Sequence, residues 1–248
     1  MIFRQVFFVF LLIVSLNVCA QNSPKIKVGP GMEAVKLCDR AYFYISYDDM
    51  GSFGVVQCNG LILVNNGEAA LLDTPANDER TAMLVKWIEE GLKARLTTFI
   101  PNHWHGDCLG GLAYLQTKGV KSYANQMTID IARKEKLPVP DYGFTDSLTV
   151  KLGDMDLCCY YPGRGHSTDN IVVWIPSEKI LFGECMVKEL KATGLGNLSD
   201  AVVKEWPLTI DKVMRKYPDA RIVIPGHGAY GNRELLQHTR ELLQKAEK

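Results

Sequence analysis

The sequence is poor in histidine and carries no excess of charge of either sign. Its 248 residues include only five histidines, and its 28 basic residues match its 28 acidic residues. A balanced charge leaves no electrostatic footprint for nucleic acid or for an acidic lipid surface. The composition is 47% hydrophobic, which excludes a disordered chain and is sufficient to bury a sizeable core.

Repeats and linkers are also missing. No self-similarity at a period of about 20 to 50 residues, no low-complexity tract and no linker rich in Pro, Gly or Ser interrupts residues 21–248. The absence of a composition boundary favours a single domain over residues 21–248.

Long apolar runs are confined to the first twenty residues. Arg4 precedes an unbroken apolar run from Val6 to Val14, and Cys19 and Ala20 end the segment, which predicts a signal peptide over residues 1–20. The run is shorter than the roughly 20 residues that a membrane anchor needs. A lipid anchor on Cys19 is the other alternative, and bulky Val18 disfavours it. Cleavage removes one of the 28 basic residues and no acid, so 27 basic and 28 acidic residues remain. The expected location is the periplasm, without stable membrane association.

No Cys-x-x-Cys pair occurs, which argues against a closed structural zinc site. After cleavage the chain keeps six cysteines: Cys38, Cys58, Cys108, Cys158, Cys159 and Cys185. Export would place them where disulfides persist, but their irregular spacing does not indicate a disulfide framework. At least one of them is better explained as a metal ligand.

The first part of the chain is strand-like. Short apolar or alternating runs separated by Gly, Asn and Asp predict strands over 25–28, 41–47, 60–66 and 68–74. Between the second and third runs, two glycines flank Phe53, and the pattern indicates a mobile hairpin tip that carries this aromatic side chain.

Helices then alternate with strands. Helical spacing predicts helices over 78–90, 110–117, 126–134, 200–216 with a bend at Pro207, and 233–246. Further strands are expected over 96–101, 147–152, 157–161, 171–175, 179–182 and 221–224. This order predicts an α/β fold of two packed sheets with helices outside.

Two of the five histidines, His103 and His105, lie one residue apart after the strand that ends at Pro101. In an extended segment, side chains at i and i+2 project to the same side, so both imidazoles can reach one cation.

Other potential ligands follow apolar runs in the same way. His166 in "GRGHSTDN", Cys185 in "LFGEC" and His227 in "IPGHGAYG" each lie in or beside a glycine-containing turn, where irregular backbone can aim side chains at a common point. The fifth histidine, His238, falls within an expected helix. With Asp107 in "HWHGD", the chain offers six ligands.

The ligand types suggest the metal and the number of ions. Imidazoles with one thiolate and one carboxylate suit zinc better than magnesium or calcium. Six ligands exceed the three or four that one zinc ion takes. Two zinc ions are therefore expected, one held by His103, His105 and His166 and the other by Asp107, Cys185 and His227, each with an open position.

These motifs carry a resemblance to a known family. "HWHGD", "GHSTDN", the cysteine and "PGHG", in that order, resemble the metallo-β-lactamase superfamily. Cys108 directly after Asp107, together with Cys185, resembles the class B β-lactamases of subclass B1. The similarity spans the mature chain and extends to the carbapenem-hydrolysing enzymes of Gram-negative anaerobes. It implies a four-layer αββα sandwich.

The resemblance also implies an activity. Zinc-bound hydroxide, oriented by Asp107, would open the β-lactam ring of penicillins, cephalosporins and carbapenems. Lys188 would pair with the substrate carboxylate, Asn197 would lie near the carbonyl, and Phe53 would belong to a flap. Asn197 equally suits a turn or helix cap. The implied partner is a small molecule, and the implied state is a monomer.

Two alternatives remain, a thioester or lactone hydrolase of the same superfamily and a non-catalytic periplasmic zinc-binding protein. Cys185, Lys188 and the export signal argue against the first. Glu184 favours the second, because it stands where these enzymes commonly have glycine. Arg164, two residues before His166, is a further departure. An acid beside the second zinc site is expected to alter metal affinity or the reception of an anionic substrate.

Overall fold

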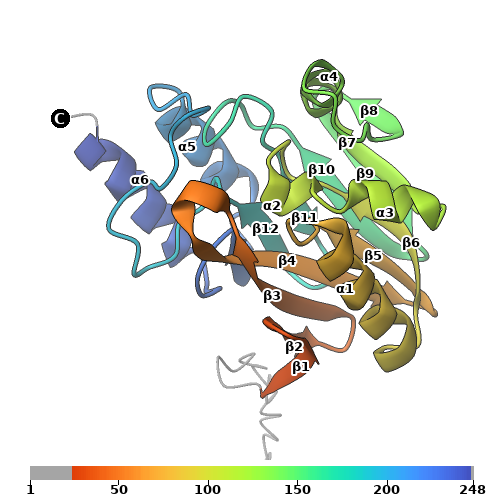
Figure 1. Cartoon of the computed structure of the whole chain (residues 1–248). Coiled ribbons are helices and arrows are strands. Elements are labelled where there is room, and N and C mark those ends of the chain that lie inside the picture. The colour runs from red at the N-terminus through yellow and green to blue at the C-terminus, as the bar shows by residue number, and fades with distance from the viewer. Residues whose placement is uncertain (1–23, 247–248) are drawn as a thin grey trace, which may run out of the picture.

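Two β-sheets pack face to face and helices cover their outer faces (Figure 1). The computed structural model describes residues 24–246, so the expected signal peptide lies outside the described residues. The four layers match the αββα sandwich that the sequence predicts.

The first sheet contains eight strands in sequence order. They are β1 (Lys25–Gly29), β2 (Met32–Cys38), β3 (Ala41–Asp49), β4 (Val55–Asn65), β5 (Glu68–Leu72), β6 (Arg95–Ile100), β7 (Lys121–Asn125) and β8 (Tyr142–Phe144). Strands β1 to β5 pair antiparallel, whereas β5 to β8 pair parallel. Since parallel strands share a carboxyl edge, the loops after β5 and β6 leave the sheet at the same side.

The second sheet contains five strands in the order β13-β12-β11-β10-β9. They are β9 (Ser147–Leu152), β10 (Met155–Tyr160), β11 (Val172–Ile175), β12 (Ile180–Glu184) and β13 (Ile222–Pro225). Only β12 and β13 pair in parallel within this sheet, so both deliver the residues that follow them to one edge.

The central strands are buried on both faces, which explains why they read as continuous apolar runs. In β3, Phe43 joins the core between the two sheets, where it shares a cluster with Phe182. Its neighbour Tyr44 points to the opposite face and packs with Leu84 of α1 (Asp78–Gly91). Successive side chains of β3 therefore pack into the cores on opposite faces of the sheet.

Helices cover each sheet from outside (Figure 1). Leu84 of α1 and Leu115 of α3 (Leu112–Thr117) lie in the core beneath the first sheet. Ile210 of α5 (Trp206–Lys216) and Leu236 of α6 (Glu234–Ala246) lie in the core beneath the second sheet. The remaining helices are α2 (Gly106–Leu109) and α4 (Gln126–Lys134). Across residues 24–246, no helix combines the length and apolar character needed to cross a bilayer.

Two of the expected helices differ from the structure. The predicted helix over 200–216 was wrong in its start, because α5 begins at Trp206 and places Pro207 in its first turn instead of at a bend. Proline lacks the N–H that an interior position would donate, and the first turn needs no such donor. The predicted helix over 110–117 is α3, which begins two residues later than expected, at Leu112. The short helix α2 before it is not predicted by the sequence, and Gly110 and Gly111 separate the two.

The sequence does not predict strands β2, β7 and β8. Strand β2 alternates with the charged residues Glu33 and Lys36, which interrupt its apolar run. Strands β7 and β8 are short, and β8 has only three residues. Short strands of this kind are defined by their neighbours in the sheet more than by their own pattern.

The expected hairpin tip lies between β3 and β4. It contains a single 3-10 turn, η1 (Gly51–Phe53), and the side chain of Phe53 is 63% exposed. Gly51 and Gly54 have φ angles of 65° and 68°, in the left-handed region that glycine adopts without a steric penalty. The two glycines therefore permit the tight turn that presents Phe53.

Candidate metal centre

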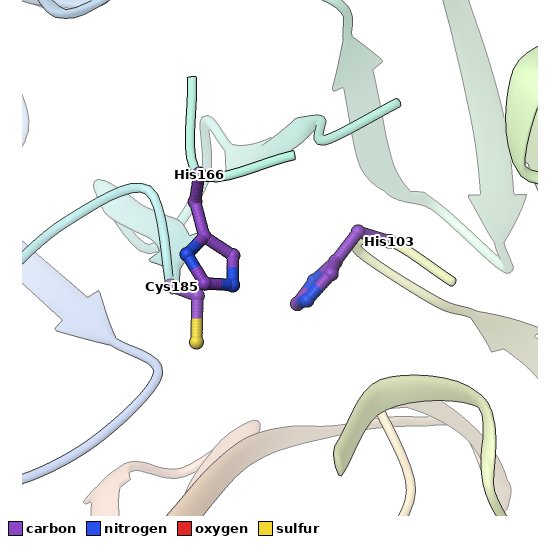
Figure 2. Close-up of side chains that lie close together, drawn as sticks. All are labelled: His103, His166 and Cys185. Carbon is purple, nitrogen blue, oxygen red and sulfur yellow. The ribbon is translucent and has the colours of Figure 1, made fainter. Parts of the chain in front are cut away.

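The six predicted ligands meet at the edge where strands of both sheets end. His103 and His105 lie in the loop after β6, and Asp107 lies in the first turn of α2. His166 lies in the loop between β10 and β11, Cys185 follows β12, and His227 follows β13. Figure 2 shows His103, His166 and Cys185 pointing into one space from three separate segments.

Three histidines form the first cluster. Nε2 of His103 lies 2.8 Å from Nδ1 of His105. The ring of His166 has its centroid 5.0 Å from that of His103 and 5.2 Å from that of His105. His103 and His166 are buried, and His166 also lines the cavity described below. One cation could be reached by all three rings.

Asp107, Cys185 and His227 form the second cluster. The sulfur of Cys185 lies 3.1 Å from Nε2 of His227 and 3.8 Å from Oδ2 of Asp107. The remaining pair, Nε2 of His227 and Oδ2 of Asp107, is 3.5 Å apart. Ligand atoms around tetrahedral zinc are about 3.3–3.8 Å apart, given its bond lengths. Two of the three observed distances fall in this range and the sulfur–nitrogen distance is about 0.2 Å shorter, so the spacing is close to that around a zinc ion.

The two clusters adjoin. Nε2 of His103 lies 4.0 Å from Oδ1 of Asp107, and the ligand atoms of His103, His166 and Cys185 lie within 4.8 Å of one another. Cys58 also groups with Asp107 and His227. Sequence reasoning missed Cys58 because it lies inside β4, with no turn or histidine beside it.

Burial shifts the pKa of the histidine ligands and that of the cysteine ligand in opposite directions. It lowers the pKa of His103 and His166 well below the usual value, so both imidazoles are neutral and carry a lone pair. Burial raises the pKa of the Cys185 thiol, and the charges of Glu184 and Asp107 raise it further. A cation would reverse that shift, because metal binding requires the thiolate.

Two buried atoms of the predicted ligands, Oδ1 of Asp107 and Nδ1 of His166, have no hydrogen-bond partner. An unpaired carboxylate oxygen in the interior is costly unless an ion or water satisfies it. The orphaned oxygen and the mixed donor set of nitrogen, sulfur and oxygen therefore fit a metal such as zinc.

Two ligand histidines have partners for their other ring nitrogen. Nε2 of His105 lies 2.8 Å from Oδ2 of Asp200, and Nδ1 of His227 lies 2.7 Å from the carbonyl oxygen of Gln57. Such partners fix the tautomer and orientation of a metal ligand. The sequence does not indicate this role for Asp200, because the residue falls at the start of an expected helix.

Loop contacts hold the ligand-bearing segments in place. Oδ1 of Asp73, at the end of β5, accepts a hydrogen bond of 2.6 Å from the backbone N–H of Asn102, the residue before His103. In the His166 loop, Oδ1 of Asn170 accepts a bond of 3.0 Å from the backbone N–H of Ser167. These contacts stiffen the backbone on both sides of the first cluster.

A cavity of about 420 Å³ opens above the clusters. It is lined by Met50, Phe53, Val56, Trp104, His105, Gly106, Asp107, His166, Cys185, Lys188, Gly196, Asn197 and His227. All three predicted substrate-binding residues therefore face the space above the metal ligands.

Lys188 and Asn197 differ in how they are held. Lys188 is only 8% exposed, and its Nζ lies 5.4 Å from the ring centre of Trp206. Oδ1 of Asn197 accepts a hydrogen bond of 3.0 Å from the backbone N–H of Ser199. Asn197 thus accepts a hydrogen bond within a turn through its oxygen and also lines the cavity.

The cysteines form no disulfide among residues 24–246. All six, from Cys38 to Cys185, are free thiols. The irregular spacing noted in the sequence thus corresponds to separate positions in the fold, and Cys185 is available as a ligand.

Comparisons with known proteins extend the picture. Sequence profiles of protein families give no match. A type 2 metallo-beta-lactamase of Bacteroides fragilis is 54% identical over 242 residues, covering 98% of this chain and 96% of the relative. A type 2 metallo-beta-lactamase of Bacillus cereus is 37% identical over 200 residues, covering 80% and 78%. The solved structure of a metallo-beta-lactamase from Pontibacter korlensis has a TM-score of 0.82 and 39% identity, covering 86% of this chain and 99% of that chain.

Fold and site together define a metal-dependent hydrolase built as an αββα sandwich. The sequence identity of 54% with the Bacteroides fragilis enzyme, over nearly the whole chain, also shows the family. The chain belongs to the metallo-beta-lactamases. The family and fold predicted from the motifs are therefore confirmed, as is the prediction of a metal-dependent β-lactamase.

Proposed function

We propose that the chain is an exported, monomeric enzyme that uses two zinc ions to open the lactam ring of penicillins, cephalosporins and carbapenems. A single domain over residues 21–248 and a signal peptide over residues 1–20 are part of this proposal. It is supported above all by the two adjoining clusters of three ligands at the floor of one cavity.

Each of the two ligand sets would bind one zinc ion. His103, His105 and His166 would hold one zinc ion, and Asp107, Cys185 and His227 would hold the other. When bound, zinc supplies Lewis acidity and lowers the pKa of a coordinated water to about 7. Oδ2 of Asp107 faces the second cluster, which leaves Oδ1 free to accept a hydrogen bond from the attacking water and so to orient it.

The cavity wall would position the substrate. The ammonium of Lys188 would attract the carboxylate beside the lactam nitrogen, and the amide nitrogen of Asn197 would donate to the lactam carbonyl. Phe53, exposed at the hairpin tip, would cover the apolar part of the substrate and exclude water.

Chelation provides the central test. We expect purified mature protein with zinc to hydrolyse a chromogenic cephalosporin, to lose this activity with a strong chelator, and to regain it when two equivalents of zinc are added. Absorbance records turnover, and elemental analysis records the metal bound. Turnover that survives complete metal removal would contradict the proposal. Hydrolysis of thioesters or lactones alone would favour the other hydrolase, and zinc binding without turnover would favour the binding protein.

Lys188 provides a test of substrate recognition. The variant Lys188→Ala removes a nearly buried cation that would pair with the substrate carboxylate, so KM for a cephalosporin should rise about 10- to 100-fold, as for the loss of one charged hydrogen bond. Steady-state kinetics measure the effect. The exposed Lys191→Ala serves as the control and should leave KM unchanged. If both variants had the same KM, Lys188 would not be a substrate-binding residue.

A further inference from the structure

Glu184 is a buried acid at the end of β12, directly before Cys185. It is only 1% exposed, and its φ angle of 49° lies in the left-handed region that favours glycine. Both a buried carboxylate and this backbone conformation oppose stability, so the fold alone gives no reason for a glutamate here.

The carboxylate of Glu184 touches both ligand clusters. Its Oε2 lies 3.4 Å from Nδ1 of His103, the nitrogen on the far side of the ring from His105. The same oxygen accepts a hydrogen bond from the backbone N–H of Cys185. One side chain thus contacts a member of each cluster, and it is not among the residues that line the cavity.

The surroundings of Glu184 contain further acids but no paired lysine or arginine among the described residues. Its carboxylate, a carboxylate oxygen of Asp73 and the sulfur of Cys108 lie within 4.8 Å of one another. Oδ2 of Asp73 is buried without a hydrogen-bond partner. Within the described chain, no lysine or arginine forms an ion pair with Glu184. The positive charge nearest to this carboxylate would be that of the bound metal ions.

We propose that Glu184 is a positioning residue for the metal sites, which accepts a hydrogen bond from Nδ1–H of His103 and so aims Nε2 of that ring at the first metal ion. This inference rests on the proposed metal sites. In this structure the hydrogen-bond partner of the same nitrogen is the sulfur of Cys108, 3.1 Å away, and the carboxylate of Glu184 lies beside it at 3.4 Å. A thiol is a weaker acceptor than a carboxylate, so the proposal gives the hydrogen bond to Glu184 when a metal ion is bound. Carboxylate partners of metal-bound histidines hold the ring and increase its basicity, which strengthens metal binding.

Two variants separate charge from shape. Glu184→Gly removes the carboxylate and suits the positive φ angle, so the backbone stays folded. Glu184→Gln keeps the shape and an oxygen acceptor but removes the charge. Glu178→Gln is the matched control, because Glu178 is also shielded, with 14% side-chain exposure, but it pairs with Arg40 through a contact of 2.6 Å away from the metal ligands.

Metal affinity is the readout. Competition with a chromophoric chelator gives the dissociation constants for zinc, and ¹¹³Cd nuclear magnetic resonance separates the ion bound to the Cys185 thiolate from the ion bound by imidazoles. We expect Glu184→Gly to weaken binding at the three-histidine site about 10- to 100-fold, as for the loss of other partners of metal ligands. The zinc affinity of Glu184→Gln at this site should lie between those of Glu184→Gly and the wild type. The affinity of Glu178→Gln should equal that of the wild type.

The outcomes separate this inference from the proposed function. Weaker binding at the three-histidine site supports the inference whether or not the second site also weakens. Unchanged or tighter binding there in Glu184→Gly, or an equal loss in Glu178→Gln, would overturn it. If the wild type binds fewer than two metal ions, the proposed function fails first, before any variant is compared.

Discussion

Replacing Cys185 with serine is expected to lower kcat/KM for β-lactam hydrolysis on the order of 10²-fold or more. A metal ion at a reacting centre supplies several kcal/mol of transition-state stabilisation, and each 1.36 kcal/mol is tenfold in rate. A serine hydroxyl does not ionise near neutral pH as a metal-bound thiol does, so the cluster with Asp107 and His227 loses its anionic sulfur.

The measurement combines kinetics with metal counting. Native mass spectrometry should find one zinc ion in the variant under conditions where the wild type holds two. Cys158→Ser, which removes a half-buried thiol from β10, should leave both quantities unchanged. Two tightly held ions and undiminished turnover in Cys185→Ser would show that the thiol is not a ligand.

Replacing Trp206 with alanine is expected to lower the free energy of unfolding by about 3–5 kcal/mol. Trp206 is fully buried at the start of α5, and its Nε1–H donates a hydrogen bond of 3.0 Å to the carbonyl oxygen of Met186. Its ring centroid lies 5.9 Å from that of His166. Truncation leaves a cavity and an unsatisfied carbonyl, and it removes support from a ligand and from Lys188.

Urea unfolding in the presence of a chelator measures this change without the contribution of metal binding. Leu208→Ala is the control, because Leu208 is 64% exposed two positions along the same helix and should change the free energy of unfolding by less than about 0.5 kcal/mol. A loss below about 1 kcal/mol in Trp206→Ala would mean that the surrounding core closes over the gap.

The sequence predicts candidate metal ligands because most of them follow an apolar strand at a turn. His103, His166 and His227 are conspicuous for this reason, and the structure brings them to one edge. Asp200 and Cys58 could not be found in the same way. Their proximity to His105 and His227 arises from tertiary packing, and neither has a local pattern that distinguishes it from a cap residue or a core thiol.

The layers of the fold were predictable for a similar reason. Strands β3, β4 and β5 are buried on both faces, so their apolar runs are long enough to recognise. The start of α5 was not predictable, because residues 200–205 have helical spacing but form turns before Trp206. Local spacing does not report that Pro207 fits the first turn of a helix better than its interior.

Each proposed cation would join the two halves of the sandwich. The first cluster takes His103 and His105 from the loop after β6 and His166 from the opposite sheet, and the second combines Asp107 with Cys185 in the same way. Neither sheet alone supplies a complete set of three donors. Zinc would therefore act as a cross-link between the layers, and its binding free energy would add to their cohesion.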